Sequence, residues 1–306
     1  MLIEKHALWG EEPMPDKPAT YTAYLADEVG EGSRDARPAV IICGGGGFES
    51  IAAHECEPVA LEFINRGYQA FVLNYVTAET GDIAYPAPEA DLACMVATVR
   101  ANAGAWHVDG NRVVVVGFSA GGFIAASVAA RWREASLAGA VGARSELLRP
   151  DAVVLAYPLL DLAAWRAWRT RDPRIDLRVP KTGGKTGRDL VNEFFSRLAG
   201  GEADDEALAA ICPAAAVDRQ MPPTFVWHAA DDQTVPVAQT YGFAARLAAE
   251  GVAHELHVFD RGGHGMSCAG ANALPADADE AHRERREAVR PWLELALAFL
   301  DRHLAK

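Results

Sequence analysis

The sequence predicts an α/β fold, a mostly parallel central sheet with helices on both faces. Short runs of aliphatic and β-branched residues alternate along the chain with stretches of helical spacing, an order typical of βαβ units. The clearest run, Val113 to Val116, is apolar at every position, as expected for a strand buried on both faces of a parallel sheet. Half of the 306 residues are hydrophobic, so we expect one large domain over residues 1–306.

The first half of the chain begins with a Pro- and charge-rich segment. Within it, residues 21–25 alternate and predict an edge strand of an N-terminal hairpin, with residues 30–37 as turn and loop. The rest of this half predicts strands and helices in turn: a strand at 38–43, a helix at 58–65, a strand at 70–75 and a helix at 87–102.

The second half continues the alternation after one long interruption. Residues 161–221 do not fit the rhythm, and we expect them to form a cap insertion over the carboxyl edge of the sheet. Within it, Trp165 and Trp168 share a helix face and are interpreted as packing residues rather than substrate platforms. The other predicted elements are strands at 152–157, 224–228 and 254–259, helices at 190–198 and 237–250, and one long amphipathic helix at 282–303 with Trp292, Leu295, Phe299 and Leu300 toward the sheet.

Composition excludes several classes of partner. The formal net charge is −13, and an acidic surface repels phosphate backbones, so we expect no nucleic acid partner. The five cysteines are scattered and form no CxxC pair, which predicts neither a disulfide framework nor a zinc site. No segment has the length of a signal peptide core or a membrane span. We therefore expect a soluble cytoplasmic protein without a membrane partner, and the sequence leaves a homo-oligomer open.

A G-x-S-x-G pentapeptide, Gly117 to Gly121, directly follows the valine run and precedes a helix of small residues. Strand, sharp turn and helix are the setting of a nucleophile elbow, in which the turn exposes the serine hydroxyl. We therefore predict Ser119 as a nucleophile. The N–H of the next residue, Ala120, lies at the helix N-terminus and is predicted to hold a developing oxyanion.

A serine hydroxyl needs a base to take its proton, and the base needs an acid to fix its tautomer. When these partners follow an elbow, the acid precedes the histidine in the chain. His264 lies in a glycine-rich loop directly after a predicted strand and is the predicted base. The acid is expected in the loop after residues 224–228, where Asp232 is favoured and Asp231 is the alternative.

A glycine-rich loop, Gly44 to Gly47, follows the first buried strand. Glycines allow a close approach of the backbone to a substrate and can turn N–H groups toward it. This is the position from which the second oxyanion donor comes in such sites, so the loop is predicted to supply it.

These motifs together resemble the α/β-hydrolase esterase/lipase superfamily, and most of all its acetyl-xylan-esterase-like and feruloyl-esterase-like branch. The similarity covers about residues 38–300. It implies an α/β-hydrolase fold with Ser119 as nucleophile, His264 as base and Asp232 as orienting acid. It also implies Gly45, Gly46 and Ala120 as oxyanion donors, although Gly44 stands where many relatives have His or Pro. The motifs on which the resemblance rests are Gly44–Phe48, Gly117–Gly122, Trp227–Asp232 with Val235 and Pro236, and Gly263–Gly265.

The resemblance implies a serine carboxylesterase that removes short acyl groups, acetyl above all, from sugars or similar small esters. Its substrate would be a small-molecule ester, and its chemistry needs neither a metal nor an organic cofactor. Two alternatives stay open. One is a general carboxylesterase or lipase-like enzyme that acts on aryl or alkyl esters, and the other is a binding protein that keeps the hydrolase shell without catalysis.

Overall fold

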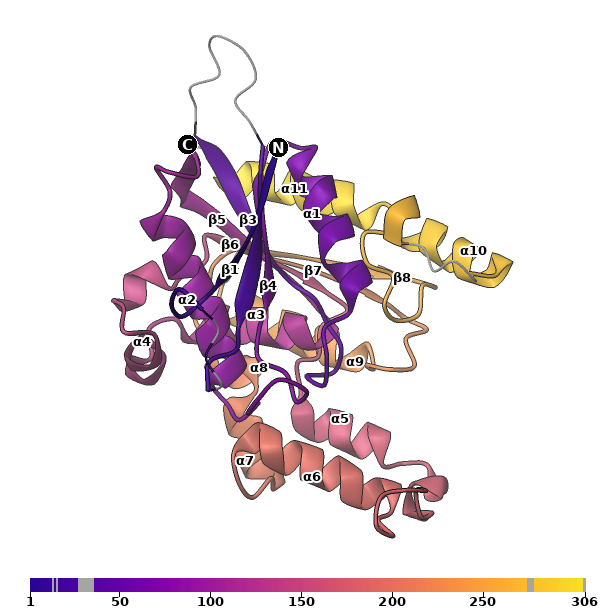
Figure 1. The fold of residues 1–306 in the computed structure, drawn as a ribbon. Coiled ribbons are helices and arrows are strands. Elements are labelled where there is room, and N and C mark those ends of the chain that lie inside the picture. Colours follow the sequence, from indigo (N-terminus) through magenta and orange to yellow (C-terminus); the bar gives the residue numbers. More distant parts are fainter. Residues whose placement is uncertain (13, 15, 27–35, 274–277, 305–306) are drawn as a thin grey trace.

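The computed structural model describes residues 1–12, 14, 16–26, 36–273 and 278–304 (Figure 1). Within them, eight strands form one sheet in the order β1-β2-β4-β3-β5-β6-β7-β8. Only the β1–β2 and β2–β4 pairs are antiparallel, and all other neighbours are parallel. The predicted α/β fold is confirmed. The strands are β1 (Leu2–Ala7), β2 (Thr20–Leu25), β3 (Arg37–Cys43), β4 (Gln69–Asn74), β5 (Val108–Phe118), β6 (Ala152–Ala156), β7 (Thr224–Ala229) and β8 (His254–Phe259).

The N-terminal hairpin differs from its prediction in one respect. Residues 21–25 were expected at the edge of the sheet, but β2 lies between β1 and β4. The edge strand is β1, where Leu2 and Ile3 are exposed. The side chains of β1 are mostly exposed, so its sequence lacks the alternation of apolar and polar residues that identified β2. Most of the predicted loop at 30–37 lies outside the described residues, and Arg37 already belongs to β3.

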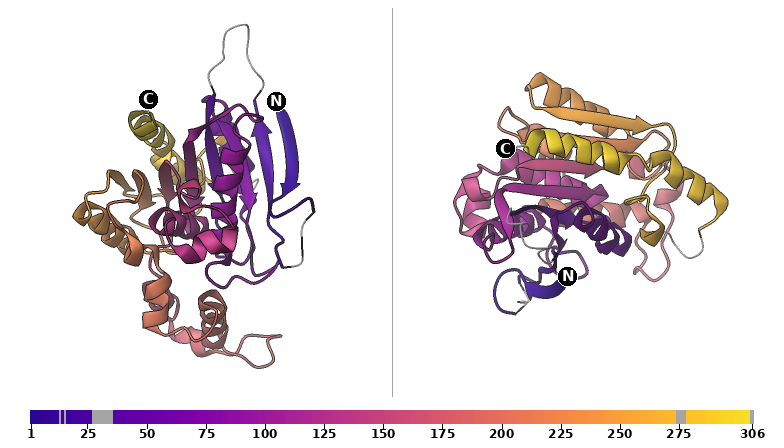
Figure 2. Two further views of the ribbon diagram at one scale, coloured as in Figure 1. Left: turned by 90° about the vertical axis from the view of Figure 1, so that its left-hand side faces the viewer. Right: turned by 90° about the horizontal axis from the view of Figure 1, so that it is seen from above.

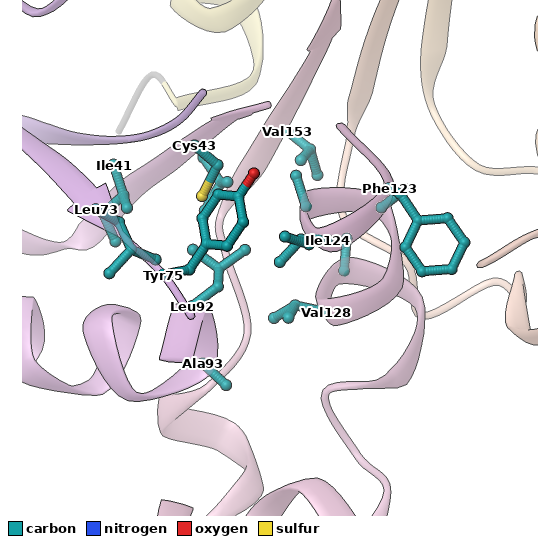
Figure 3. Packing of buried hydrophobic residues seen from close by; sticks show 14 of the residues in the cluster. Ile41, Cys43, Leu73, Tyr75, Leu92, Ala93, Phe123, Ile124, Val128 and Val153 are labelled. Atoms are coloured by element: carbon teal, nitrogen blue, oxygen red, sulfur yellow. The ribbon is translucent and has the colours of Figure 1, made fainter. Parts of the chain in front are cut away.

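Helices cover both faces of the sheet. On one face, α2 and α3 pack on the strands, and Figure 3 shows Ile124 and Val128 of α3 beside Leu92 of α2. On the other face lie α1 and α11 (Figure 1). The helices are α1 (Glu57–Ile64), α2 (Ala87–Ala101), α3 (Ser119–Arg131), α4 (Ala135–Val141), α5 (Leu162–Arg169), α6 (Gly187–Ala199), α7 (Asp205–Ile211), α8 (Pro213–Ala216), α9 (Ala238–Ala249), α10 (Glu280–Val289) and α11 (Trp292–Leu304).

The C-terminal tail is not the single helix that was predicted for residues 282–303. It consists of α10 and α11, which are separated at Arg290 and Pro291. Proline has no N–H for a helical hydrogen bond and clashes with the preceding turn, so it ends one helix and begins the next. Trp292 and Phe299 are buried, as predicted.

Residues 161–221 contain helices α5 to α8 and follow the carboxyl end of β6. Figure 2 shows that part of this segment projects beyond the sheet. The predicted helix at 190–198 is the central part of α6, which begins at a capping box formed by Thr186 and Asp189. The function of this segment as a cap stays a prediction, as does the single domain.

Other sequence-based expectations concern cysteines and membranes. All five cysteines are free thiols. In the described part of the chain, no helix is both long and apolar enough to cross a bilayer.

A buried carboxylate in α2 predicts a pH-dependent stability. Glu89 is 3% exposed, and its Oε2 has no hydrogen-bond partner among the described residues. Burial raises the pKa of Glu89 from 4.5 to about 7. Because this pKa is higher in the folded than in the unfolded protein, protonation of Glu89 stabilises the fold. This stabilisation is fully present below about pH 4.5 and is lost as the pH rises through 7. This difference corresponds to about 3 kcal/mol.

The substitution Glu89→Gln removes this titration. From pH 4.5 to pH 9, we expect the free energy of unfolding of the original protein to fall by about 3 kcal/mol more than that of the variant. Urea denaturation at both pH values measures the shift. Parallel pH profiles of the two proteins would contradict it.

Candidate active site

Ser119 lies at the junction of β5 and α3, in a turn that leaves it in the left-handed region with φ 52°. Such a φ is strained for a residue with a side chain and is typical of functional turns. The glycines around it are sterically required. A Cβ on Gly121 would lie 2.2 Å from the carbonyl oxygen of Cys43, and one on Gly117 would lie 2.4 Å from that of Gly121. The elbow predicted from the sequence therefore has its expected geometry.

Three side chains from distant parts of the chain form a continuous row of hydrogen bonds. The Nε2 atom of His264 lies 2.8 Å from Oγ of Ser119, and its Nδ1 lies 2.6 Å from Oδ2 of Asp232. A carboxylate can only accept, so Nδ1 carries the proton and Nε2 accepts from the serine hydroxyl. This tautomer is the one that a general base at Ser119 requires.

Asp232 is buried and is held by four donors. Its Oδ1 accepts from the N–H groups of Thr234 and Val235, at 2.8 and 2.9 Å. Its Oδ2 accepts from His264 and also from Nε2 of His228, at 3.1 Å. Burial alone would raise the pKa of Asp232, but the hydrogen bonds from His228 and His264 outweigh it and lower the pKa well below its usual range. The carboxylate therefore stays ionised.

The alternative acid, Asp231, has a different place. Its Oδ1 accepts from the backbone N–H of Gly263, at 2.7 Å, and so ties the acid loop to the loop that carries His264. The contact with His264 itself is made by Asp232, as the sequence analysis favoured.

His228 contacts Asp232, although the sequence analysis assigned it no role. It is fully buried at the end of β7, and its Nδ1 lies 2.7 Å from Oγ1 of Thr240. Among the described residues, Nε2 faces only acceptors, namely Asp232 and the carbonyl of Val235, so it carries the proton. The only sequence signal was its position four residues before Asp232.

The glycine loop lies against Ser119, since a Cβ on Gly45 would be 2.8 Å from the serine Cβ. The N–H of Gly45 is already used, because it donates to Oε2 of Glu55 at 2.6 Å. This bond to a buried acceptor, which the sequence did not reveal, argues against Gly45 as an oxyanion donor. For the N–H of Gly46, the described residues offer no hydrogen-bond acceptor.

Ala120 occupies the first turn of α3, where backbone N–H groups have no acceptor within the helix. In the described part of the chain, its N–H has no partner outside the helix either. Among the described residues, the N–H of Gly46, in the glycine loop beside Ser119, and the N–H of Ala120, directly after Ser119, thus have no partner.

The insertion is connected directly to the loop that carries the acid. From α5, Nε1 of Trp165 donates to the carbonyl of Thr234 at 3.1 Å, and Nε1 of Trp168 donates to that of Gln233 at 3.3 Å. Trp165 is buried, whereas Trp168 is partly exposed. Both contacts agree with the packing role that the sequence indicated.

In the described ranges, no group of three or more His, Cys, Asp or Glu side chains is arranged to hold a metal ion.

A mostly parallel sheet, with a strained serine between strand and helix that contacts a histidine, defines the class as the α/β-hydrolases. Comparison with solved structures agrees. The carboxylesterase Cest-2923 from Lactobacillus plantarum WCFS1 is 26% identical, with a TM-score of 0.75 over 99% of this chain and 98% of that one. An acetyl ester-xyloside bifunctional hydrolase from Caldicellulosiruptor lactoaceticus is 29% identical, with a TM-score of 0.65 over 92% and 89%.

The chain belongs to the BD-FAE family, whose model matches residues 29–247. It is a serine ester hydrolase of the α/β-hydrolase class, and the resemblance inferred from the sequence is confirmed. A curated relative, endo-1,4-beta-xylanase B of Butyrivibrio fibrisolvens, is 31% identical over 242 residues, which are 76% of this chain. The chain spans only about a third of the length of that relative.

Proposed function

We propose that this esterase removes short acyl groups, acetyl above all, from acylated sugars or xylo-oligosaccharides. Ser119, His264 and Asp232 form its catalytic triad, and the N–H groups of Gly46 and Ala120 form its oxyanion hole. The observation that carries the proposal is the row of hydrogen bonds from Ser119 through His264 to Asp232, at 2.8 and 2.6 Å.

The proposed reaction follows from this geometry. His264 takes the hydroxyl proton while Oγ of Ser119 attacks the ester carbonyl, and the ionised Asp232 stabilises the imidazolium that forms. The tetrahedral oxyanion binds to the N–H groups of Gly46 and Ala120. The alcohol leaves with the proton from His264, and an acyl-serine forms. Water, activated by the same histidine, then attacks the acyl-serine, releases the carboxylic acid and restores the serine.

The preference for acetylated sugars is supported by two relatives rather than by the geometry. One is named as an acetyl ester-xyloside hydrolase, and the other as a xylanase. A general carboxylesterase for aryl or alkyl esters is the second candidate, because the relative with the TM-score of 0.75 is named simply as a carboxylesterase.

A substrate panel separates the two candidates. We expect kcat/KM to be highest for acetylated xylo-oligosaccharides, lower for p-nitrophenyl acetate, and to fall further for p-nitrophenyl esters of longer acids. A maximum at medium or long acyl chains, with no activity on acetylated sugars, would favour the general esterase. No hydrolysis of any ester by the folded protein would leave only a binding role.

A substitution in the glycine loop tests the oxyanion hole. At Gly46, φ is 124° and a Cβ would lie 2.1 Å from the carbonyl oxygen of Ser50, so Gly46→Ala must displace this peptide. Loss of one such donor lowers kcat about 100- to 1000-fold, and we expect an effect of this size on p-nitrophenyl acetate.

The neighbouring Gly47 provides a matched control. Its φ is also positive, 66°, but a Cβ there would meet no atom within 4 Å. We expect Gly47→Ala to keep kcat within a few-fold of the original value. Equal losses in both variants would assign the effect to general loosening of the loop.

A further inference from the structure

A buried carboxylate, Glu55, joins the glycine loop to the loop that carries the base. Glu55 is 2% exposed and lies in a short turn directly before α1. Its Oε2 accepts from the N–H of Gly45 at 2.6 Å, and its Oε1 accepts from the hydroxyl of Tyr157 at 2.7 Å. The triad described above does not include it.

Tyr157 continues the connection toward His264. Its hydroxyl accepts from the backbone N–H of Ser267 at 2.9 Å, three residues after the base. Its ring packs edge-on against the imidazole of His264, with the ring centroids 4.8 Å apart. Burial raises the pKa of the Tyr157 hydroxyl, and the charge of Glu55 raises it further, so the phenol keeps its proton and donates it to the carboxylate.

The carbonyl groups of Gly44 and Gly45 are also held by hydrogen bonds. The carbonyl of Gly44 accepts from the hydroxyl of Tyr75 at 2.7 Å, so the peptide between Gly44 and Gly45 is fixed at both ends. The carbonyl of Gly45 accepts from the N–H of Ala52 at 2.9 Å. The N–H of Gly46 belongs to the same peptide as the carbonyl of Gly45, so these hydrogen bonds also fix the direction in which that N–H points.

A carboxylate suits this position because two donors converge on it. One oxygen of Glu55 accepts from the N–H of Gly45, and the other accepts from the hydroxyl of Tyr157. A buried N–H that lacks an acceptor is unfavourable, so without Glu55 the Gly45 peptide is expected to rotate in search of another partner. Such a rotation would move the adjacent N–H of Gly46.

We propose that Glu55 is a positioning residue for ester hydrolysis, which orients the N–H of Gly46 through Gly45 and the loop of His264 through Tyr157. Glu55 acts through these groups and does not touch the substrate. The inference rests on the proposed function, because it concerns the oxyanion hole of that reaction.

The test combines kinetics with a ligand that imitates the transition state. A methyl trifluoromethyl ketone adds to the serine and forms a tetrahedral oxyanion, so its affinity reports the oxyanion hole. Glu55→Met removes both acceptors, and we expect it to lower kcat for p-nitrophenyl acetate about 100-fold with KM within threefold. The affinity for the ketone should fall by the same factor.

Two further variants keep the test decisive if Glu55→Met does not fold. Glu55→Gln retains one amide oxygen for Gly45 and should restore kcat to within about tenfold of the original value. Tyr157→Phe deletes only the hydroxyl and should lower kcat about tenfold, the effect of one lost hydrogen bond.

Glu57 and Tyr24 form a matched control pair. Oε2 of Glu57 accepts from the hydroxyl of Tyr24 at 2.7 Å. This tyrosine–glutamate bond is of the same kind as the one between Tyr157 and Glu55, and Glu57 lies only two residues after Glu55. Neither side chain contacts the glycine loop through a hydrogen bond in the described residues. Glu57→Gln and Tyr24→Phe should leave both kcat and the affinity for the ketone unchanged.

The outcomes separate this inference from the proposed function. A folded Glu55→Met or Tyr157→Phe variant that keeps the original kcat and ketone affinity overturns the inference alone. So does a loss of kcat without a matching loss of ketone affinity, which would reveal a merely structural role. If the original protein neither hydrolyses p-nitrophenyl acetate nor binds the ketone, the proposed function fails, and the inference fails with it.

Discussion

The variant Ser119→Ala is expected to hydrolyse p-nitrophenyl acetate with kcat lowered about a millionfold. The substitution removes the proposed nucleophile, Oγ, which lies 2.8 Å from Nε2 of His264. Alanine is smaller than serine and accepts the same backbone, so the melting temperature should change little. Initial rates at saturating substrate, with active-site titration of the original protein, measure the effect.

Ser127 offers a matched control in the same helix. It is fully buried in α3, and its hydroxyl has no hydrogen-bond partner among the described residues. Ser127→Ala should therefore keep the activity of the original protein. A Ser119→Ala protein that retains a tenth of the original kcat would refute the assignment of the nucleophile.

The second large effect is expected at Asp232. Asp232→Asn should lower kcat about ten-thousandfold, because an amide that turns its NH2 group to His264 selects the wrong imidazole tautomer. It also removes the negative charge that stabilises the imidazolium, and this charge is held in place by hydrogen bonds from His228 and two backbone N–H groups.

Asp231→Asn is the control for this prediction. Its Oδ1 accepts from the N–H of Gly263 at 2.7 Å, and an asparagine oxygen can accept the same bond. We expect kcat to stay within about tenfold, the worth of one weakened hydrogen bond. If the Asp231 variant loses more activity than the Asp232 variant, the acid is assigned to the wrong aspartate.

The sheet could be predicted from the sequence because its central strands are buried on both faces. In β5, Val113 to Val116 are completely buried. An uninterrupted apolar run of this kind is typical of a strand that is covered on both faces in a parallel sheet. The exposed edge strand β1 lacked this signal. The break at Pro291 was visible in the sequence, but the amphipathic pattern on both sides suggested one continuous helix.

The candidate site also has a part that could be predicted from the sequence and a part that could not. Ser119, His264 and Asp232 follow strands whose carboxyl ends meet at one edge, so their approach could be inferred from strand order and loop composition. The environment of Glu55 could not. It is one acidic residue among several near the start of α1, and its burial depends on Gly45 and Tyr157, which come from distant parts of the chain. Without knowledge of this contact, the sequence gives no reason to prefer Gly46 over Gly45 as an oxyanion donor.

The identity of the serine that carries the covalent intermediate tests the central claim most directly. The original protein is treated with a fluorophosphonate, digested, and the modified residue is identified by mass spectrometry. A single adduct on Ser119, formed rapidly at neutral pH and absent after unfolding in denaturant, is the predicted result. An adduct on another serine, or none on the folded protein, would contradict the account.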